Sequence, residues 1–247
     1  MPRIAIPLPL STDPEYVERS LPQYEHAVRM AGGEPVRIPL DLDKSELKRL
    51  VASCAAVLLP GSKTDVDPAK YGASKHEKTA PPDPRRDDVD CALLEHAYAS
   101  KKPILGICYG LQSLNVYRSG TLIQHIPDFL SLERRGINHA AGRTVAVAHD
   151  AEIDPASTLA QIIGDGAADT IRIPVNSSHH QSADQPGNGL KIVAHCPNDG
   201  IIEAVESTGT DHFVLAVQWH PERSVEDDEP SRAIFHAFVQ AARSSAR

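Results

Sequence analysis

Pro103-Ile-Leu-Gly-Ile-Cys-Tyr-Gly-Leu-Gln112 is the stretch that decides the fold of this chain. Its apolar first half is typical of a buried strand, and its second half begins a helix. Between them, Gly106-x-Cys108-x-Gly110 predicts a sharp strand-to-helix turn that presents one side chain at the carboxyl edge of a sheet. A helix amino terminus also favours negative charge, so it favours the thiolate form of a cysteine. The stretch therefore makes Cys108 a candidate nucleophile.

Strand and helix patterns alternate around this turn. Apolar runs of strand length occur at 3–7, 35–39, 55–59 and 103–107. Helical patterns lie between and after them, at 16–31, 44–52, 85–100 and from Cys108 to about 120. Such alternation implies a mostly parallel sheet with helices on both faces.

The second half of the chain is richer in strands. We expect strands at 143–148, 170–175, 190–195, 201–206 and 213–219, and a closing helix at 230–243. These strands predict an antiparallel extension of the sheet. The expected fold class is therefore α/β, a flavodoxin-like three-layer sandwich. No segment resembles an interdomain linker, so we expect residues 1–247 to form a single domain.

The composition narrows the classes of partner. The formal net charge of −8 argues against nucleic acid, because phosphate binding needs a basic face. The absence of a long apolar run or a signal peptide argues against a membrane protein. The four cysteines lie far apart without a C-x-x-C pair, which favours reduced thiols in the cytoplasm. Three of them sit in or beside apolar stretches, so we expect Cys54, Cys91 and Cys196 to lie in the core. The 12 histidines show no close ligand spacing, so we expect neither a metal nor a cofactor.

A catalytic cysteine needs a base, and one histidine is well placed for that role. Val217-Gln-Trp-His220-Pro-Glu222 follows an expected strand, and Pro221 ends that strand. Residues two apart in an extended chain point the same way, so Glu222 can fix the imidazole of His220. This is the nucleophile, base and orienting group of a catalytic triad. Ligands of open α/β sheets also bind beyond the carboxyl ends of strands.

Together, these motifs resemble the class I glutamine amidotransferase superfamily. Within it, the chain resembles the free-standing hydrolases of the peptidase C26 or γ-glutamyl-γ-aminobutyrate hydrolase type. The narrower resemblance rests on four further stretches: Leu58-Leu-Pro-Gly61 with Thr64-Asp-Val-Asp-Pro-x-x-Tyr-Gly72, Arg86-Asp-x-x-Asp90, Gly120-Thr-Leu-x-Gln124 and Val175-Asn-Ser-x-His-His-Gln181. They span residues 58 to 222 in the order of the family.

The resemblance implies a cysteine-dependent hydrolase that cleaves the γ-glutamyl amide bond of a small γ-glutamyl compound. Cys108 would attack the carbonyl, His220 would act as base and then as acid, and Glu222 would orient the histidine. An amine would leave first, and water would then hydrolyse the γ-glutamyl thioester to glutamate. Backbone amides at Gly61 and Tyr109 would form the oxyanion hole, and the substrate would be held by Gln112, Asn176, Ser177, Ser178 and His179.

The sequence departs from the family after Gly61. Ser62-Lys63 stand where relatives usually show a second glycine, which eases a positive φ and a close approach of backbone to substrate.

Two other functions remain open at the level of sequence. One is an ammonia-supplying glutaminase subunit of a biosynthetic complex, and the other is a non-catalytic γ-glutamyl-binding protein. The leaving amine depends on the loops at 62–84 and 126–142, whose sequences do not identify it. A homodimer is common in the family, but the sequence does not fix the oligomeric state.

Overall fold

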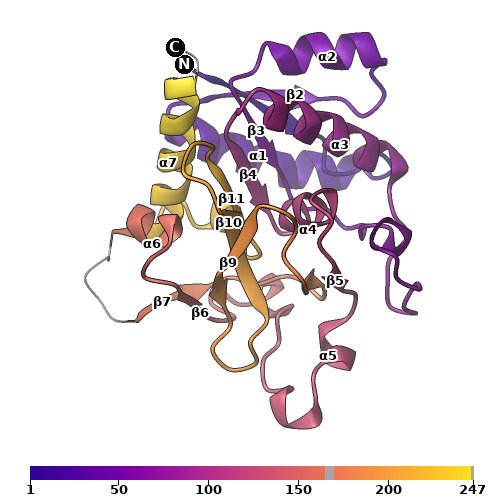
Figure 1. The fold of residues 1–247 in the computed structure, drawn as a ribbon, viewed down its shortest axis with the longest axis vertical. Coiled ribbons are helices and arrows are strands. Elements are labelled where there is room, and N and C mark those ends of the chain that lie inside the picture. The colour runs from indigo at the N-terminus through magenta and orange to yellow at the C-terminus, as the bar shows by residue number, and fades with distance from the viewer. Residues whose placement is uncertain (165–169, 246–247) are drawn as a thin grey trace.

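A nine-stranded sheet forms the centre of the computed structural model, which describes residues 1–164 and 170–245 (Figure 1). Its parallel half runs in the order β2 (Glu34–Ile38), β1 (Arg3–Pro7), β3 (Ala56–Leu59), β4 (Ile104–Ile107) and β11 (Val214–Val217). The antiparallel half continues with β10 (Ile202–Ser207), β9 (Leu190–His195), β6 (His149–Ile153) and β7 (Ile171–Val175). The expected mostly parallel sheet with an antiparallel extension is confirmed.

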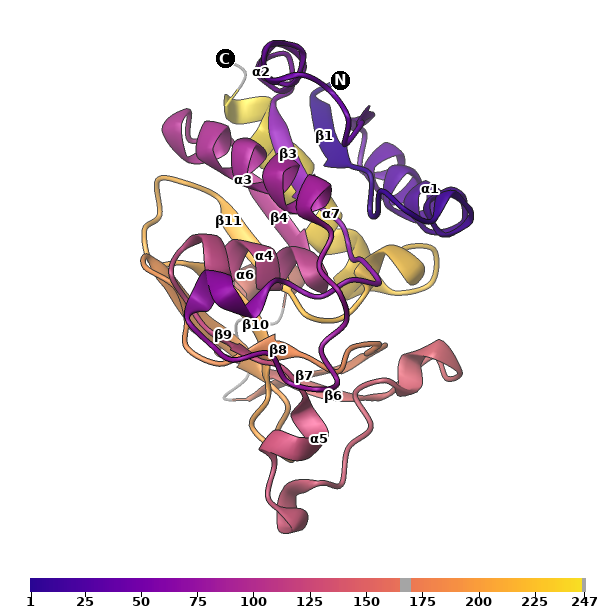
Figure 2. The same cartoon turned by 90° about the vertical axis from the view of Figure 1, so that its right-hand side faces the viewer.

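Helices cover both faces of the sheet and complete three layers (Figures 1 and 2). One face packs against α1 (Pro14–Met30), α6 (Thr158–Ile163) and α7 (Glu229–Ser245). The other packs against α2 (Lys44–Ala52), α3 (Pro84–Ala99) and α4 (Tyr109–Tyr117). Local sequence sets where these helices begin. In α2, for example, Asp43 and Glu46 form a reciprocal capping box at the amino terminus. The two hydrophobic cores on either side of the sheet hold its strands in place.

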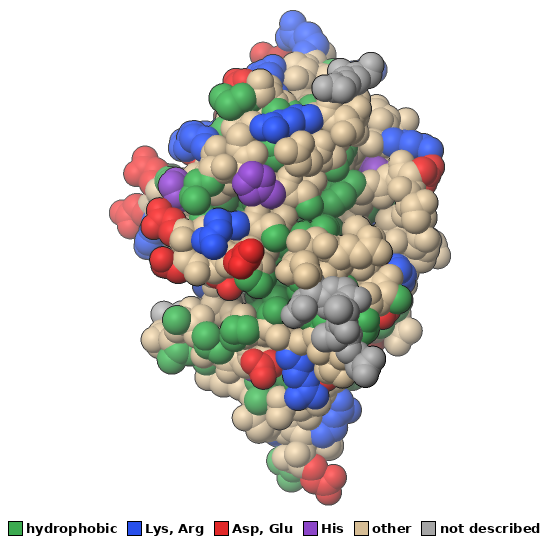
Figure 3. Space-filling model, turned by 90° about the vertical axis from the view of Figure 1, so that its left-hand side faces the viewer, with side chains coloured by type: hydrophobic (Ala, Val, Ile, Leu, Met, Phe, Trp, Pro, Cys, Tyr) green, Lys and Arg blue, Asp and Glu red, His purple; other side chains and the backbone are tan. Residues whose placement is uncertain are grey.

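Shorter elements lie beside the antiparallel half. A second sheet pairs β5 (Leu122–Ile123) with β8 (Ser182–Ala183), and α5 (Ile126–Phe129) extends away from the body of the molecule (Figure 2). Single 3₁₀ turns span Pro68–Tyr71, Leu132–Arg134, Ala141–Arg143 and Pro221–Arg223. The face seen in Figure 3 carries acidic and basic side chains interspersed with hydrophobic ones. Within the described residues, every helix is too short or too polar to cross a bilayer.

The prediction of a strand at 143–148 is wrong. The chain enters the sheet only where the amide of Ala148 donates to Val175, and the strand β6 begins at His149. Just before it, Gly142 donates to the carbonyl of Ser177 within a 3₁₀ turn, which keeps this segment out of the ladder. Val145 and Val147 suggested a strand but are exposed. The short helix α6 was not predicted.

Candidate active site

Cys108 lies in a strained turn between β4 and α4. Its backbone has φ 54° and ψ −106°, a conformation that costs about 1–3 kcal/mol for a residue with a side chain. The flanking glycines make the turn possible, because a Cβ on Gly110 would lie 2.1 Å from the carbonyl oxygen of Leu59. A Cβ on Gly106 would lie 2.8 Å from the carbonyl oxygen of Gly110. The Gly-x-Cys-x-Gly motif is therefore a packing requirement at this crossing of β3, β4 and α4.

The neighbouring strand β11 brings the histidine to the same edge. Val217 pairs with Ile107, and its carbonyl accepts from the amide of Cys108 at 2.8 Å. The chain then leaves the sheet, and Nδ1 of His220 lies 2.7 Å from Oε1 of Glu222. All three candidate catalytic side chains are buried, at 7% exposure for Cys108 and 4% for the other two residues.

Gly61, which follows β3, lies against both groups. A Cβ added to it would be 3.2 Å from Cε1 of His220 and 3.7 Å from Cβ of Cys108. The structure thus brings the cysteine, the histidine and the glycine loop together. The amide of Gly61 donates to Oη of Tyr24 at 3.1 Å, so an oxyanion at this amide has to replace the phenol as acceptor.

Ser62 does not strain the glycine loop. Among the described residues other than glycine, positive φ values occur at Lys101, Cys108 and Ser119, and Ser62 lies outside this group. The second glycine that relatives usually show is therefore not needed for the backbone conformation here. The next residue, Lys63, lies 2.6 Å from Asp13 and stacks over the ring of Tyr16 at 4.7 Å.

The charges in the site favour an imidazolium. Burial alone lowers the pKa of His220, but the carboxylate of Glu222 and the sulfur of Cys108 raise it to about 9. Burial alone raises the pKa of Glu222, but the attraction of His220 holds it below its ordinary value. Burial raises the pKa of Tyr24 well above its ordinary range, so this side chain stays a phenol.

A buried arginine holds the loop before Gly61 by a hydrogen bond to its backbone. Arg86 of α3 donates to the carbonyl of Pro60 at 2.8 Å and to that of Pro9 at 3.1 Å. Its Nε lies 2.7 Å from Asp90, and both side chains are fully buried. The Arg86-Asp-x-x-Asp90 motif therefore ties the loops after β1 and β3 together.

Comparisons with known proteins identify the family of this chain. The family model described as Peptidase C26 matches residues 9–222. The chain belongs to the peptidase C26 family. It is 32% identical over 223 residues to the gamma-glutamyl-gamma-aminobutyrate hydrolase of Escherichia coli K12, which covers 89% of this chain and 84% of that one.

Other relatives of this peptidase C26 chain carry different names. A Mycobacterium tuberculosis protein named as a glutamine amidotransferase is 40% identical over 220 residues, which are 89% of this chain and 66% of that longer one. Among solved structures, a GMP synthase subunit from Thermoplasma acidophilum superposes with a TM-score of 0.63 at 16% identity, over 99% of this chain and 95% of that one. This last likeness concerns the fold alone.

The peptidase C26 motif at 175–181 places Asn176 as a clamp on the histidine. Its Oδ1 accepts from the amide of His220 at 2.9 Å, and its Nδ2 donates to the carbonyl of the same residue at 3.0 Å. The Nδ2 also donates to Oγ of Ser224 at 2.9 Å. Asn176 was predicted to hold substrate, and in the structure its amide is fully engaged in positioning the histidine.

The other four predicted substrate residues make different contacts. The Oγ of Ser178 accepts at 2.8 Å from Arg223, the residue after Glu222. Gln112 donates to the carbonyl of Gln181 at 3.2 Å from the first turn of α4. Ser177 is fully buried, and His179 points toward Glu203, which two further histidines also face.

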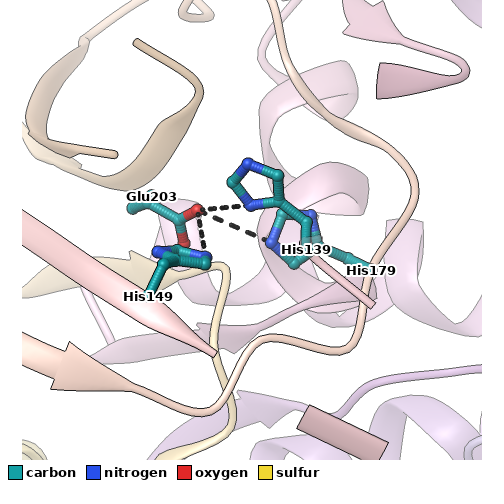
Figure 4. Close-up of side chains that lie close together, drawn as sticks. All are labelled: His139, His149, His179 and Glu203. Atoms are coloured by element: carbon teal, nitrogen blue, oxygen red, sulfur yellow. Dashed lines mark ion pairs between the residues drawn. The ribbon is translucent and has the colours of Figure 1, made fainter. Parts of the chain in front are cut away.

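This cluster, His139, His149, His179 and Glu203, was not foreseen (Figure 4). The four residues come from a loop, from β6, from the segment after β7 and from β10. No spacing rule links them, so only the folded chain brings them together.

The remaining cysteines are free thiols away from this site. Cys54 and Cys196 are buried, as predicted, and burial raises the pKa of the Cys196 thiol to about 12. The expectation that Cys91 lies in the core is wrong, because it is exposed on α3. The apolar residues around Cys91 face the core from other positions of the helix. Because its thiol is exposed, Cys91 is a useful internal control for labelling.

Proposed function

We propose that this chain is a thiol hydrolase that cleaves the γ-glutamyl amide bond of a small γ-glutamyl compound. The observation that carries the proposal is the meeting of Cys108 and His220 against Gly61 at the carboxyl edge of the sheet. The names of its E. coli relatives, gamma-glutamyl-gamma-aminobutyrate hydrolases, support a substrate of this class.

The proposed reaction has two halves. The sulfur of Cys108 attacks the γ-carbonyl carbon, and the amide at Tyr109, in the first turn of α4, stabilises the negative oxygen. His220 holds the thiol proton as an imidazolium and gives it to the departing amine, which leaves a γ-glutamyl thioester. A water molecule then loses a proton to His220 and attacks the thioester. Glutamate leaves, and the proton returns to the sulfur.

We propose that the leaving amine extends toward a hollow of about 530 Å³. The two loops expected to select the amine both line this hollow, and they meet where Nε2 of His76 lies 3.5 Å from Oδ2 of Asp128. A chain of side-chain contacts connects the loop after Gly61 with this hollow. Asp65 of that loop lies 3.2 Å from His180, and the ring of His180 packs against the ring of His125, which lines the hollow. Its charged and imidazole side chains, Lys75, His76, His125, Asp128 and Asp184, suit a small polar amine.

Glutamate release by the purified chain tests the proposal. We expect wild-type protein and Cys91→Ala to release glutamate from members of a panel of γ-glutamyl amines, and Cys108→Ala to release none. Labelling with iodoacetamide in the Cys91→Ala background should modify Cys108, the most exposed of the three remaining thiols, and remove activity in proportion. Unchanged turnover by Cys108→Ala would overturn the thiol mechanism.

The same panel separates the alternatives. An ammonia-supplying subunit would act on glutamine and would be idle without its synthase partner, and the names of several relatives as glutamine amidotransferases keep this candidate in view. A binding protein would bind γ-glutamyl ligands tightly and release no product. We further propose that the protein works in the cytoplasm, where its four free thiols stay reduced, and that its oligomer, if any, is a homodimer.

A further inference from the structure

The histidine cluster is built like a metal site. The side chains of His139, His149 and His179 are at most 2% exposed, and that of Glu203 is fully buried. One imidazole nitrogen of each ring faces the same carboxylate oxygen, Oε1 of Glu203, as Figure 4 shows. These facing atoms have no hydrogen-bond partner among the described residues. Buried polar atoms without partners are rare, so each group of this kind calls for an occupant.

The distances from the carboxylate oxygen to the three nitrogens are close to those of a tetrahedral site. The Oε1 of Glu203 lies 3.2 Å from Nδ1 of His139, 3.4 Å from Nε2 of His149 and 3.6 Å from Nε2 of His179. Metal–nitrogen bonds of about 2.0–2.1 Å in a tetrahedron put neighbouring donor atoms roughly 3.3–3.4 Å apart. All four donor atoms lie within 4.8 Å of one another. A central ion could therefore bond all four after small side-chain movements.

The outward nitrogens fix the tautomers that a metal needs. Nε2 of His139 lies 2.9 Å from Asp199, Nδ1 of His149 lies 3.0 Å from the carbonyl of Asp150, and Nδ1 of His179 lies 2.8 Å from the carbonyl of Gln181. Carbonyl and carboxylate oxygens can only accept, so each outward nitrogen carries the hydrogen. In the neutral rings the lone pairs therefore point inward. Metal-binding histidines are characteristically oriented in this way.

We infer that these four residues bind one divalent transition-metal ion, with Zn²⁺ as the best fit. Three imidazoles and one carboxylate form a donor set that zinc accepts in tetrahedral geometry. Because the protein supplies all four ligands in a closed, buried site, the ion has a structural role. A proton alone can join the carboxylate to only one ring at a time, whereas a metal ion satisfies all three rings together.

The cluster is connected through the backbone to the segment that carries the candidate catalytic histidine. Glu203 accepts from the amide of Gln218 at 2.7 Å through its backbone carbonyl, two residues before His220. His179 belongs to the same segment as Asn176, which clamps His220. The ion would therefore pin together the segments that hold the base, without contact with substrate.

Metal analysis of the whole chain tests the inference independently of activity. The protein should be purified without metal-affinity chromatography from cells grown with added zinc, and its metal content measured by mass spectrometry. We expect one equivalent of Zn²⁺ per chain for wild type and for His195→Ala, which removes a half-exposed histidine from β9 of the same sheet. His149→Ala and Glu203→Gln should lose the ion.

Cobalt substitution gives a second readout that needs no variant. Apoprotein prepared with a chelator should take up one Co²⁺ per chain and show the intense visible absorption of tetrahedral coordination, and added Zn²⁺ should displace it. Metal-free protein that takes up no ion, a weak octahedral Co²⁺ spectrum, or equal loss of metal in His149→Ala and His195→Ala would each overturn the inference.

Discussion

Replacing Glu222 by glutamine tests how the charge of this side chain controls the proposed base. Glutamine keeps the volume and an acceptor oxygen at the position that lies 2.7 Å from Nδ1 of His220, but it removes the negative charge. That charge is the largest of the influences that raise the pKa of His220 to about 9. We therefore expect the alkaline limb of the kcat/KM profile to lie near pH 9 in wild type and to move toward neutral pH in Glu222→Gln.

The size of the effect follows from the same contact. A hydrogen bond to a charged group contributes roughly 1.5–3 kcal/mol. Each 1.4 kcal/mol changes a rate by about a factor of ten, so kcat/KM should fall about 10- to 150-fold at the plateau. The rise in the pKa of His220 from 6.5 to about 9 corresponds to roughly 3 kcal/mol, shared between Glu222 and Cys108. The two routes agree in order of magnitude.

The assay is glutamate release from a γ-glutamyl amine across the pH range. Glu226→Gln is the matched control, because its exposed carboxylate lies four residues further along the chain. Alkaline limbs at the same pH in Glu222→Gln and wild type would refute the reasoning. A raised pKa in the folded state stabilises the fold fully below about pH 6.5, and this stabilisation disappears as the pH rises through about 9. Urea midpoints should follow that course in wild type and lose most of it in Glu222→Gln.

Three further substitutions probe the supports of the site. Gly110→Ala should destabilise the fold by about 3 kcal/mol or more in urea titrations, because the added Cβ would lie 2.1 Å from the oxygen of Leu59; a loss below about 1 kcal/mol would contradict this. Asn176→Ala removes two hydrogen bonds to the backbone of His220, so kcat should fall about tenfold while KM changes little. A change in KM alone would indicate that Asn176 binds substrate instead. Cys108→Gly should unfold at a higher temperature than Cys108→Ala, by roughly 1 kcal/mol in free energy of unfolding, because glycine tolerates φ 54°; equal stabilities would show that the turn stores no strain.

The elements with clear local signals could be predicted from sequence. The helix at 44–52 has a capping box at its start. The apolar run at 55–59 has the length of a buried strand and is too short for a typical helix, and the strand β3 lies there. The segment 143–148 could not be predicted, because Val145 and Val147 alternate like a strand although the turn before them directs them to solvent. Local pattern is a weak guide where a tertiary contact, here from Gly142 to Ser177, decides the path.

The site shows the same division. The motif spacing brought Cys108, His220 and Glu222 into one hypothesis, because each side chain follows or adjoins a strand end. The role of Asn176 was beyond sequence, since an amide that binds substrate and one that clamps a backbone look alike in one dimension. The histidine cluster was also beyond sequence, because its members lie up to 64 positions apart, from His139 to Glu203.

The buried Arg86 has a consequence for how the loops beside the sulfur can move. Because one guanidinium holds the carbonyls of Pro9 and Pro60, the two loops can shift only together, at the expense of an ion pair sealed from water. Lys63 is free of this restraint. Its side chain is about half exposed, so it can leave Asp13 in the picoseconds to nanoseconds typical of exposed rotamers while the backbone stays in place.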